Sequence, residues 1–262
     1  MFGLSFVTEG WIETFLFVFM RFLGLIVVSP IFGRRNLPGL LRIGFCLLMS
    51  MIMMMLLPVP QNAVNANLFA FFFNVATEMV LGMLLGYISL VVFTIAIAAG
   101  QLIDMQIGFG LSSFFDPQFG MQIPLSGNFL NAILLLVFFT VNGHHMIIQM
   151  MFNSFELIKP GLVVFSPALF QTLLLYFNWF FILVIKVAFP IIAVSVITEF
   201  ALGIIVKTMP QMNVFVVGIP LKLFLGLVVM ILFLSAFVVF IEGAFDQMFV
   251  WQLKIIQGLM AQ

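Results

Sequence analysis

Apolar residues fill six long stretches of the chain, and polar or charged residues gather mainly in the connections between them. A helix needs roughly 20 mostly apolar residues to cross the hydrocarbon core of a bilayer, and each stretch approaches or exceeds that length. A membrane-spanning strand would instead alternate apolar and polar residues over about ten positions, whereas residues 79–103 include no charged side chain. The pattern predicts an all-α integral membrane protein with helices over residues 11–32, 40–57, 68–103, 125–152, 168–206 and 214–241.

The third and fifth stretches are longer than one crossing requires. The fifth carries Lys186 and Pro190 near its middle, so a broken or steeply tilted helix is an alternative interpretation of these stretches. Connections of more mixed polarity occupy residues 58–67, 104–124 and 153–167, and none has the composition of a soluble domain. We therefore expect one membrane domain without internal repeats.

The composition narrows the class of protein further. Of 262 residues, 65% are hydrophobic and 7% are charged, while soluble proteins carry roughly a quarter charged residues. A cytosolic enzyme and a disordered protein are excluded, and a formal net charge of +0 leaves no basic excess to bind nucleic acid. The single cysteine, Cys46, is expected to be a small buried hydrophobe.

Charged residues near the N-terminus indicate the orientation of the chain. Glu9 and Glu13 stand where a cleavable signal peptide would carry bases, so we expect the first stretch to remain in the mature protein. Arg34, Arg35 and Arg42 lie between the first two stretches, which predicts a cytoplasmic connection and an external N-terminus. Beyond the second stretch, lysines and arginines do not gather in every other connection, as a simple alternation of cytoplasmic and external connections would require. Such scatter is typical of a protein whose position is set by partner subunits.

Charged side chains at membrane depth are costly, so they pair inside the helix bundle or serve a function. Arg21 lies ten residues into the first stretch and needs a carboxylate or carbonyl partner. We favour structural pairing over a direct functional role for it. Glu199 and Lys207 are eight residues apart and share a helix face without being close neighbours. The other candidates are Glu78, Asp104, Lys186 and Lys222.

Catalytic motifs receive little support from the sequence. His144 and His145 are adjacent, which places them about 100° apart around a helix, and no zinc-protease spacing accompanies them. Ser126 is not preceded by the glycine of membrane serine proteases, and neither Asp104 nor Asp116 stands in a Gly-x-Gly-Asp setting. We predict that the protein is not an enzyme and that it holds no metal and no cofactor.

Small residues indicate a place where helices approach closely. Gly82 and Gly86 form a Gly-x-x-x-Gly pair on an uncharged run, and Ala96, Ala99 and Gly100 extend a small-residue face along the same stretch. Such faces let two helix backbones come into contact. The pattern does not distinguish a neighbouring helix of this chain from one of another subunit.

The connection over residues 100–117 has an unusual composition. It mixes amide and carboxyl side chains with paired phenylalanines and ends at Asp116-Pro117, where the proline disfavours helical geometry for the aspartate. Non-helical backbone at membrane depth must be buried in protein or line a cavity. A plug or gate at the centre of an assembly and an ordinary interfacial loop are the two interpretations of this segment.

Four groups of residues, spread over essentially the whole chain, resemble the FliR/SctT family of type III export-apparatus proteins. The group over residues 209–220 is the most specific, because a proline–glutamine turn followed by glycine and proline within an apolar helix has no generic reason to occur. The residues that carry the resemblance are Pro30, Arg34, Pro38, Arg42 and Gly44; Gly100, Asp104, Gln106, Gly108, Asp116 and Pro117; Asn142, Gly143 and His144; and Pro210, Gln211, Asn213, Gly218 and Pro220.

The resemblance implies a subunit that joins FliP and FliQ in a helical export gate for unfolded flagellar proteins. It implies kinked helical hairpins, with a FliP-like part over roughly residues 1–180 and a FliQ-like part over residues 181–262. The expected location is the bacterial cytoplasmic membrane within the flagellar basal body, as a multi-pass protein. FlhB and FlhA are further expected partners, together with the exported subunits and membrane lipid.

In the family, the loop that matches residues 107–124 acts as a plug across the closed pore. The resemblance therefore implies occluding roles for Phe109, Phe114 and Phe115, beside the turn at Asp116 and Pro117. The sequence from Asp116 to residue 120 resembles flagellar members more than virulence injectisome members. The alternatives are an injectisome export-gate homologue and an autonomous transporter of a solute or ion.

Overall fold

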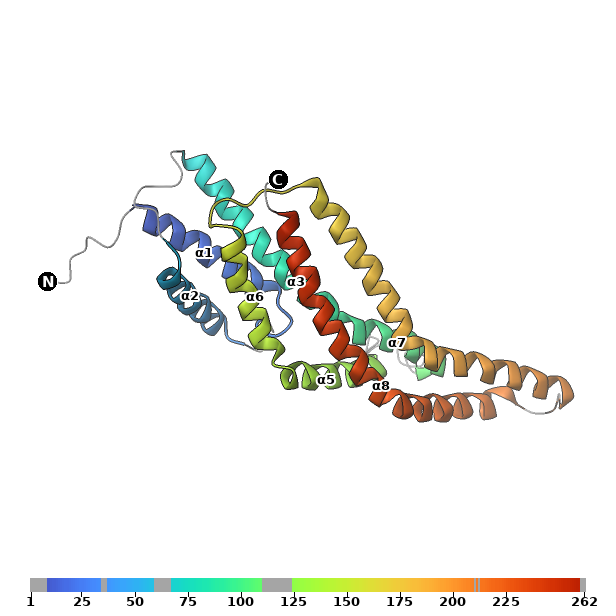
Figure 1. The fold of residues 1–262 in the computed structure, drawn as a ribbon. Coiled ribbons are helices and arrows are strands. Elements are labelled where there is room, and N and C mark those ends of the chain that lie inside the picture. The colour runs from blue at the N-terminus through green and yellow to red at the C-terminus, as the bar shows by residue number, and fades with distance from the viewer. Residues whose placement is uncertain are drawn as a thin grey trace. The chain divides into compact units, whose positions relative to one another are not determined.

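The computed structural model describes residues 9–33, 37–58, 67–109, 124–209, 211 and 213–259. Within these residues the chain is all-α, which confirms the fold class predicted from the apolar stretches. Five of the described helices are long and apolar enough to span a membrane, and a described helix pair with a short break counts as a sixth candidate. The helices are α1 (Glu9–Val28), α2 (Gly39–Leu56), α3 (Leu68–Ile107), α5 (Leu125–Thr140), α6 (Gly143–Leu157), α7 (Pro167–Thr208) and α8 (Val214–Gly258) (Figure 1).

The fourth apolar stretch, expected as one helix over residues 125–152, is divided into α5 and α6, so that prediction is wrong. Asn142 adopts a φ of 55°, a left-handed conformation that asparagine tolerates better than most residues. The backbone N–H of Val141 still bonds to Val137, but that of Asn142 bonds to Phe139, one residue nearer. The helix therefore ends at this turn and a second one begins at Gly143.

Helices α7 and α8 run through internal prolines without ending. α7 has 42 residues and contains Pro190, and α8 has 45 residues and contains Pro220. A proline removes one backbone hydrogen bond of the helix, and the remaining bonds keep each helix continuous here. α8 also extends to Gly258, well past the predicted end at residue 241. Charged residues near its end do not interrupt a helix, so apolar patterning alone underestimates its length.

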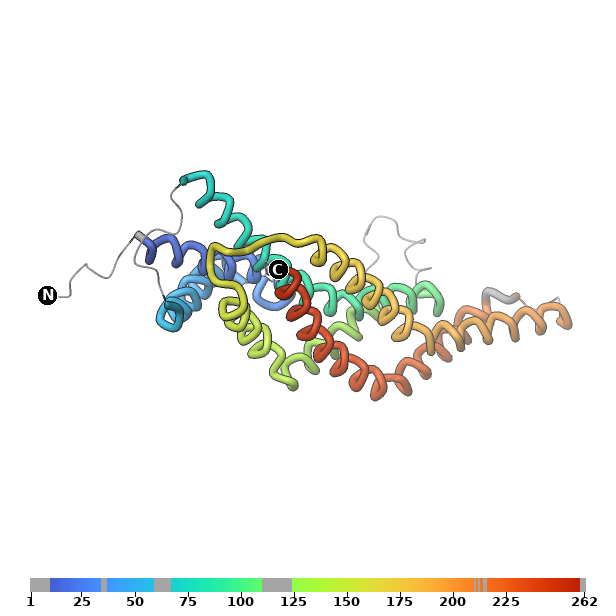
Figure 2. Tube along the Cα trace, turned by 45° about the horizontal axis from the view of Figure 1, so that its top comes forward, coloured from blue at the N-terminus to red at the C-terminus, as the bar shows by residue number. Residues whose placement is uncertain are grey.

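The chain forms two compact units. The first comprises residues 1–91, 144–176 and 247–262, and within it α2 lies beside α1 in both views (Figures 1 and 2). Phe32 and Phe45 stack with ring centroids 5.4 Å apart next to this contact. Buried hydrogen bonds also join α7 and α8 to α3 within this unit. The Tyr176 hydroxyl on α7 donates to the carbonyl of Ile88 at 2.6 Å, and Gln252 on α8 donates to the Ser89 hydroxyl at 3.1 Å.

The second unit comprises residues 92–143 and 177–246. Its core includes three buried phenylalanines, Phe93, Phe138 and Phe245, whose ring centroids lie 5.2 to 5.9 Å apart. The later part of α7 and the first part of α8 form a hairpin whose two arms lie side by side (Figures 1 and 2). This hairpin exposes many large apolar side chains.

Candidate functional site

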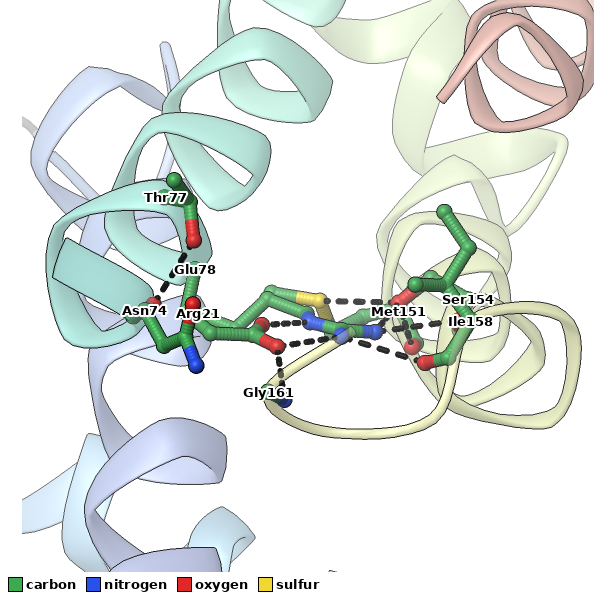
Figure 3. A network of polar contacts seen from close by, with 8 residues as sticks. All are labelled: Arg21, Asn74, Thr77, Glu78, Met151, Ser154, Ile158 and Gly161. Atoms are coloured by element: carbon green, nitrogen blue, oxygen red, sulfur yellow. Dashed lines mark hydrogen bonds and ion pairs between the residues drawn. The ribbon is translucent and has the colours of Figure 1, made fainter. Parts of the chain in front are cut away.

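Arg21 and Glu78 form a fully buried ion pair in the first unit (Figure 3). Arg21 lies on α1 and Glu78 on α3, and both side chains have no exposed surface. The guanidinium grips the carboxylate with two bonds, from Nε to Oε2 at 2.6 Å and from Nη2 to Oε1 at 3.0 Å. Bidentate pairs of this kind are among the stronger polar contacts in proteins. The predicted structural pairing of Arg21 is confirmed, with Glu78 as its partner.

The remaining N–H groups of Arg21 reach the C-terminal end of α6. Nη1 donates to the carbonyl of Ser154 at 3.0 Å and to its hydroxyl at 3.1 Å, and Nη2 donates to the carbonyl of Ile158 at 3.1 Å. A positive charge at a helix C-terminus bonds carbonyls that lack helical partners and opposes the negative end of the helix dipole. All five N–H groups of the guanidinium are therefore bonded.

Gly161 completes this network, which we call the Arg21 network and define as Arg21, Glu78, Ser154, Ile158 and Gly161. Its backbone N–H donates to Glu78 Oε1 at 2.7 Å. Gly161 has a φ of 82°, a conformation that favours glycine. The network thus joins α1, α3, the end of α6 and the connection that follows, and nothing in its geometry leaves a polar group open for a ligand.

Glycines bring α1 and α3 into backbone contact beside the Arg21 network. A Cβ on Gly82 would overlap the carbonyl oxygen of Arg21, and one on Gly86 would lie 2.7 Å from the carbonyl oxygen of Leu25. Gly24 on α1 meets α3 in the same way, with Met83 N at 2.9 Å from its would-be Cβ. The Gly-x-x-x-Gly prediction is confirmed, and the neighbouring helix belongs to this chain.

A second close contact lies at the base of the segment expected to form a plug. A Cβ on Gly100 of α3 would overlap the backbone of Gly127 on α5. Beside it, both carboxylate oxygens of Asp104 accept the backbone N–H of Ser126 at 3.2 Å. Asp104 therefore caps the first turn of α5, where N–H groups lack helical partners and the dipole favours a negative charge. These two hydrogen bonds join the end of α3 to the start of α5.

Other predicted positions along α3 also serve packing. The carbonyl of Gln106 accepts the Ser195 hydroxyl from α7 at 2.9 Å. Gly108 has a φ of 98°, so α3 ends in a conformation that favours glycine. Phe109 belongs to the segment expected to form the plug, and residues 110–123 of that segment lie outside the described residues. Gly143 is buried and faces the ring of Phe138, so a side chain there would displace it.

The turn between α7 and α8 contains the most specific group of residues. The carbonyl of Asn213 accepts the N–H groups of Val216 and Val217 and so begins α8. Gln211 is exposed, while Gly218 is buried within α8 and Pro220 is exposed. Several other predicted positions lie outside the described residues: Arg34, Phe114, Phe115, Asp116, Pro117 and Pro210.

In the hairpin, the partner of Glu199 lies on the other helix and not on the helix face that Glu199 shares with Lys207. Glu199 forms an ion pair with Lys222 of α8, whose side chain is 18% exposed against 52% for the glutamate. Lys207, which shares a helix face with Glu199, is exposed in the last turn of α7. Arg42 is partly exposed at the start of α2. An apolar pattern cannot reveal such partners, because the ion pair joins residues 23 positions apart.

No catalytic constellation is found among residues 9–33, 37–58, 67–109, 124–209, 211 and 213–259. These residues contain no group of three or more His, Cys, Asp or Glu side chains that could hold a metal. The rings of His144 and His145 lie against each other, with centroids 4.1 Å apart. Ser126 interacts with Asp104 through its backbone rather than its hydroxyl. The described side chains pack and join helices, and they define an all-α integral membrane protein.

Comparison with known proteins identifies the family. The sequence matches "Bacterial export proteins, family 1" over residues 12–248. It is 33% identical over 236 residues to flagellar biosynthetic protein FliR of Bacillus subtilis, and the aligned residues cover 88% of this chain and 90% of that protein. The FliR protein of Escherichia coli is 26% identical over 242 residues, with 92% and 91% covered. Yop proteins translocation protein T of Yersinia pestis is 25% identical over 216 residues, with 80% and 81% covered.

The chain belongs to the FliR/SctT family, and it is a component of a type III export apparatus. This confirms the resemblance carried by the four groups of residues. Membership agrees with the apolar helices, which are those of a protein embedded in a membrane.

Proposed function

We propose that the chain joins FliP and FliQ subunits to form the channel through which unfolded flagellar proteins cross the cytoplasmic membrane. In this role it performs no catalytic step, and it belongs to the flagellar basal body. The flagellar assignment is supported by the greater identity to the Bacillus subtilis FliR protein than to the Yersinia protein. FlhB and FlhA are proposed as further partners of the same assembly.

The length of exposed apolar surface is the observation that carries this proposal. Large apolar side chains are exposed along α7 from Phe170 to Ile205, on both sides of the exposed Lys186 and Glu199, a rise of about 50 Å at 1.5 Å per residue. A hydrocarbon core of about 30 Å accommodates about 40 Å of helix even at a tilt of 40°. Lipid alone cannot cover such a stripe, so part of it requires protein neighbours.

The burial of the individual helices supports the same conclusion. In their apolar segments, 61% of the α3 residues are buried within the chain, against 33% for α7 and 22% for both α2 and α8. α2, α7 and α8 therefore leave most of their apolar surface to be covered by lipid or by other chains. We propose that the α7–α8 hairpin is the FliQ-like part, from about residue 181 onward, and that the preceding residues form the FliP-like part.

Co-expression tests the channel proposal directly. We expect the chain expressed alone to be recovered poorly in detergent, because its long apolar stripes lack their partners. Co-expression with FliP and FliQ should yield one stable complex that contains all three, and loss of the gene should abolish flagellar export. A chain that is stable alone and moves a small solute in proteoliposomes would instead support the autonomous transporter.

We also propose that residues 107–124 plug the closed channel. The contacts at the base of this segment support the idea, because Asp104 with Ser126 and Gly100 with Gly127 join the two helices that flank it. In this proposal Phe109, and the more distant Phe114 and Phe115, obstruct the pore by apolar packing and exclusion of water.

Deleting residues 110–115 should make the membrane permeable to small ions and dyes, while the complex with FliP and FliQ still forms. The helix contacts at the base of the segment remain in this variant, so assembly has no reason to fail. Dye uptake by cells that contain the full apparatus measures the effect. Normal impermeability in a correctly assembled deletion variant would contradict the plug.

A further inference from the structure

Lys186 lies on an exposed apolar stripe of α7 and has no charged partner among the residues that the structure describes. The exposed neighbours on this stripe are Ile182, Ile185 and Phe189, and Lys186 itself is exposed. It makes no ion pair and no hydrogen bond with any residue that the structure describes. Between residues 179 and 194 it is the one charged side chain.

The chain itself does not offer a carboxylate to Lys186 along α7. The nearest one on this helix, Glu199, is 13 residues away in sequence, which is about 20 Å along the axis. Glu199 is also paired with Lys222. About 11 Å of apolar helix flanks Lys186 on each side. This distance separates the Lys186 ammonium from lipid headgroups, which are therefore poor partners for its charge. A charge in this setting needs a partner at the same depth.

The structure points to a carboxylate on a neighbouring subunit: we propose that the Lys186 stripe binds a membrane helix of another subunit, which places an acidic side chain against the Lys186 ammonium. This inference rests on the proposed function, in which other membrane subunits surround the chain. It adds the position of one contact and the chemistry of the partner, namely an apolar helix with a carboxylate on its exposed face.

The complementary chemistry is present on α8 of this chain. Glu242 and Asp246 are exposed beside Val239 and Val250, and neither is paired with a base among the described residues. They are four positions apart, and like charges at that spacing repel on a helix surface. The exposed face of α7 therefore carries a base at Lys186, and the later part of α8 carries two exposed carboxylates. A carboxylate on the exposed face of a membrane helix, as at Glu242 and Asp246, is the chemistry that a partner of Lys186 requires.

Substitution of Lys186 in the full chain, co-expressed with FliP and FliQ, tests the ion pair. Lys186→Met should lower the amount of chain isolated with its partners by roughly tenfold, because it leaves the partner's carboxylate buried without a counter-charge. Lys186→Arg should retain the complex, since a guanidinium also pairs with a carboxylate. Lys207→Met is the matched control, as an exposed lysine of the same helix in its last turn, and it should assemble normally.

A photoreactive amino acid at Phe189 identifies what covers the stripe. In membranes that contain the complete complex, we expect a cross-link to another polypeptide that disappears with Lys186→Met and persists with Lys207→Met. Adducts to lipid alone would overturn the proposal. So would normal assembly of Lys186→Met, or equal loss with Lys186→Arg.

Failure of this inference is separable from failure of the proposed function. If export continues in a strain without the gene, the proposed function is wrong. If export requires the gene but Lys186→Met assembles and exports like the original chain, only the Lys186 contact is wrong.

Discussion

Replacing Arg21 by methionine is expected to remove most of the chain from the membrane. The substitution preserves approximate length but leaves the Glu78 carboxylate buried without its cation, a change that costs about 3–5 kcal/mol. It also deprives the carbonyls of Ser154 and Ile158 of donors. Since whole domains are stable by about 5–15 kcal/mol, the loss is a large part of the total. The amount of full-length chain in membranes, and its thermal stability in detergent, measure the effect.

Two comparisons show whether the burial of the pair causes this effect. The double substitution Arg21→Met with Glu78→Met removes both charges, so it should recover part of the lost stability. Lys222→Met breaks a pair outside the packed core of the chain, with a half-exposed glutamate, so in the isolated chain in detergent it should cost less than the loss of Arg21. If Arg21→Met accumulated as well as Lys222→Met, the structural role of the Arg21 network would be disproved.

Gly82→Ala is expected to be nearly as damaging, although it adds a single methyl group. The new Cβ would overlap the backbone carbonyl of Arg21, and a backbone atom cannot rotate away as a side chain does. α1 and α3 would have to separate, which costs about 1–3 kcal/mol by overpacking and disturbs the hydrogen bonds of Arg21. A lower melting temperature and a higher rate of proteolysis in detergent should report the change.

Gly203→Ala and Gly243→Ala are the matched controls for Gly82. Both glycines lie inside long helices, and an added Cβ would meet nothing within 4 Å. Alanine favours a helix by about 1 kcal/mol relative to glycine, so both variants should be neutral or slightly more stable. Loss of stability in all three variants would show that glycine is needed for some reason other than the contact between α1 and α3.

Local pattern predicted the helices well where one helix fills one apolar stretch. The stretch over residues 40–57 corresponds to α2 (Gly39–Leu56), and the stretch over residues 68–103 to α3, which extends to Ile107. It failed at Val141 and Asn142, because apolar residues continue on both sides of the turn. The break depends on one left-handed residue, which hydrophobicity does not report.

Candidate polar positions were predictable, but their partners were not. Membrane depth alone indicated that Arg21 must pair, and several carboxylates were available. The choice of Glu78, 57 residues away, depends on where α1 crosses α3. The cap that Asp104 provides to α5 was likewise hidden, because the aspartate and Ser126 are separated by 22 residues of mixed composition.

The class, the family and the approximate helices of this protein follow from the amino-acid sequence alone. Length, apolar composition and short motifs act locally along a chain, so they can be recognised without knowing which segments meet. Only the tertiary structure decided that Gly82 and Gly86 pack against α1 of the same chain, and that Arg21 joins α3 to the end of α6. Helix crossings likewise set which charges pair among the described residues. Such facts depend on helix crossings, where one methyl group or one hydrogen bond separates a fitting contact from an impossible one.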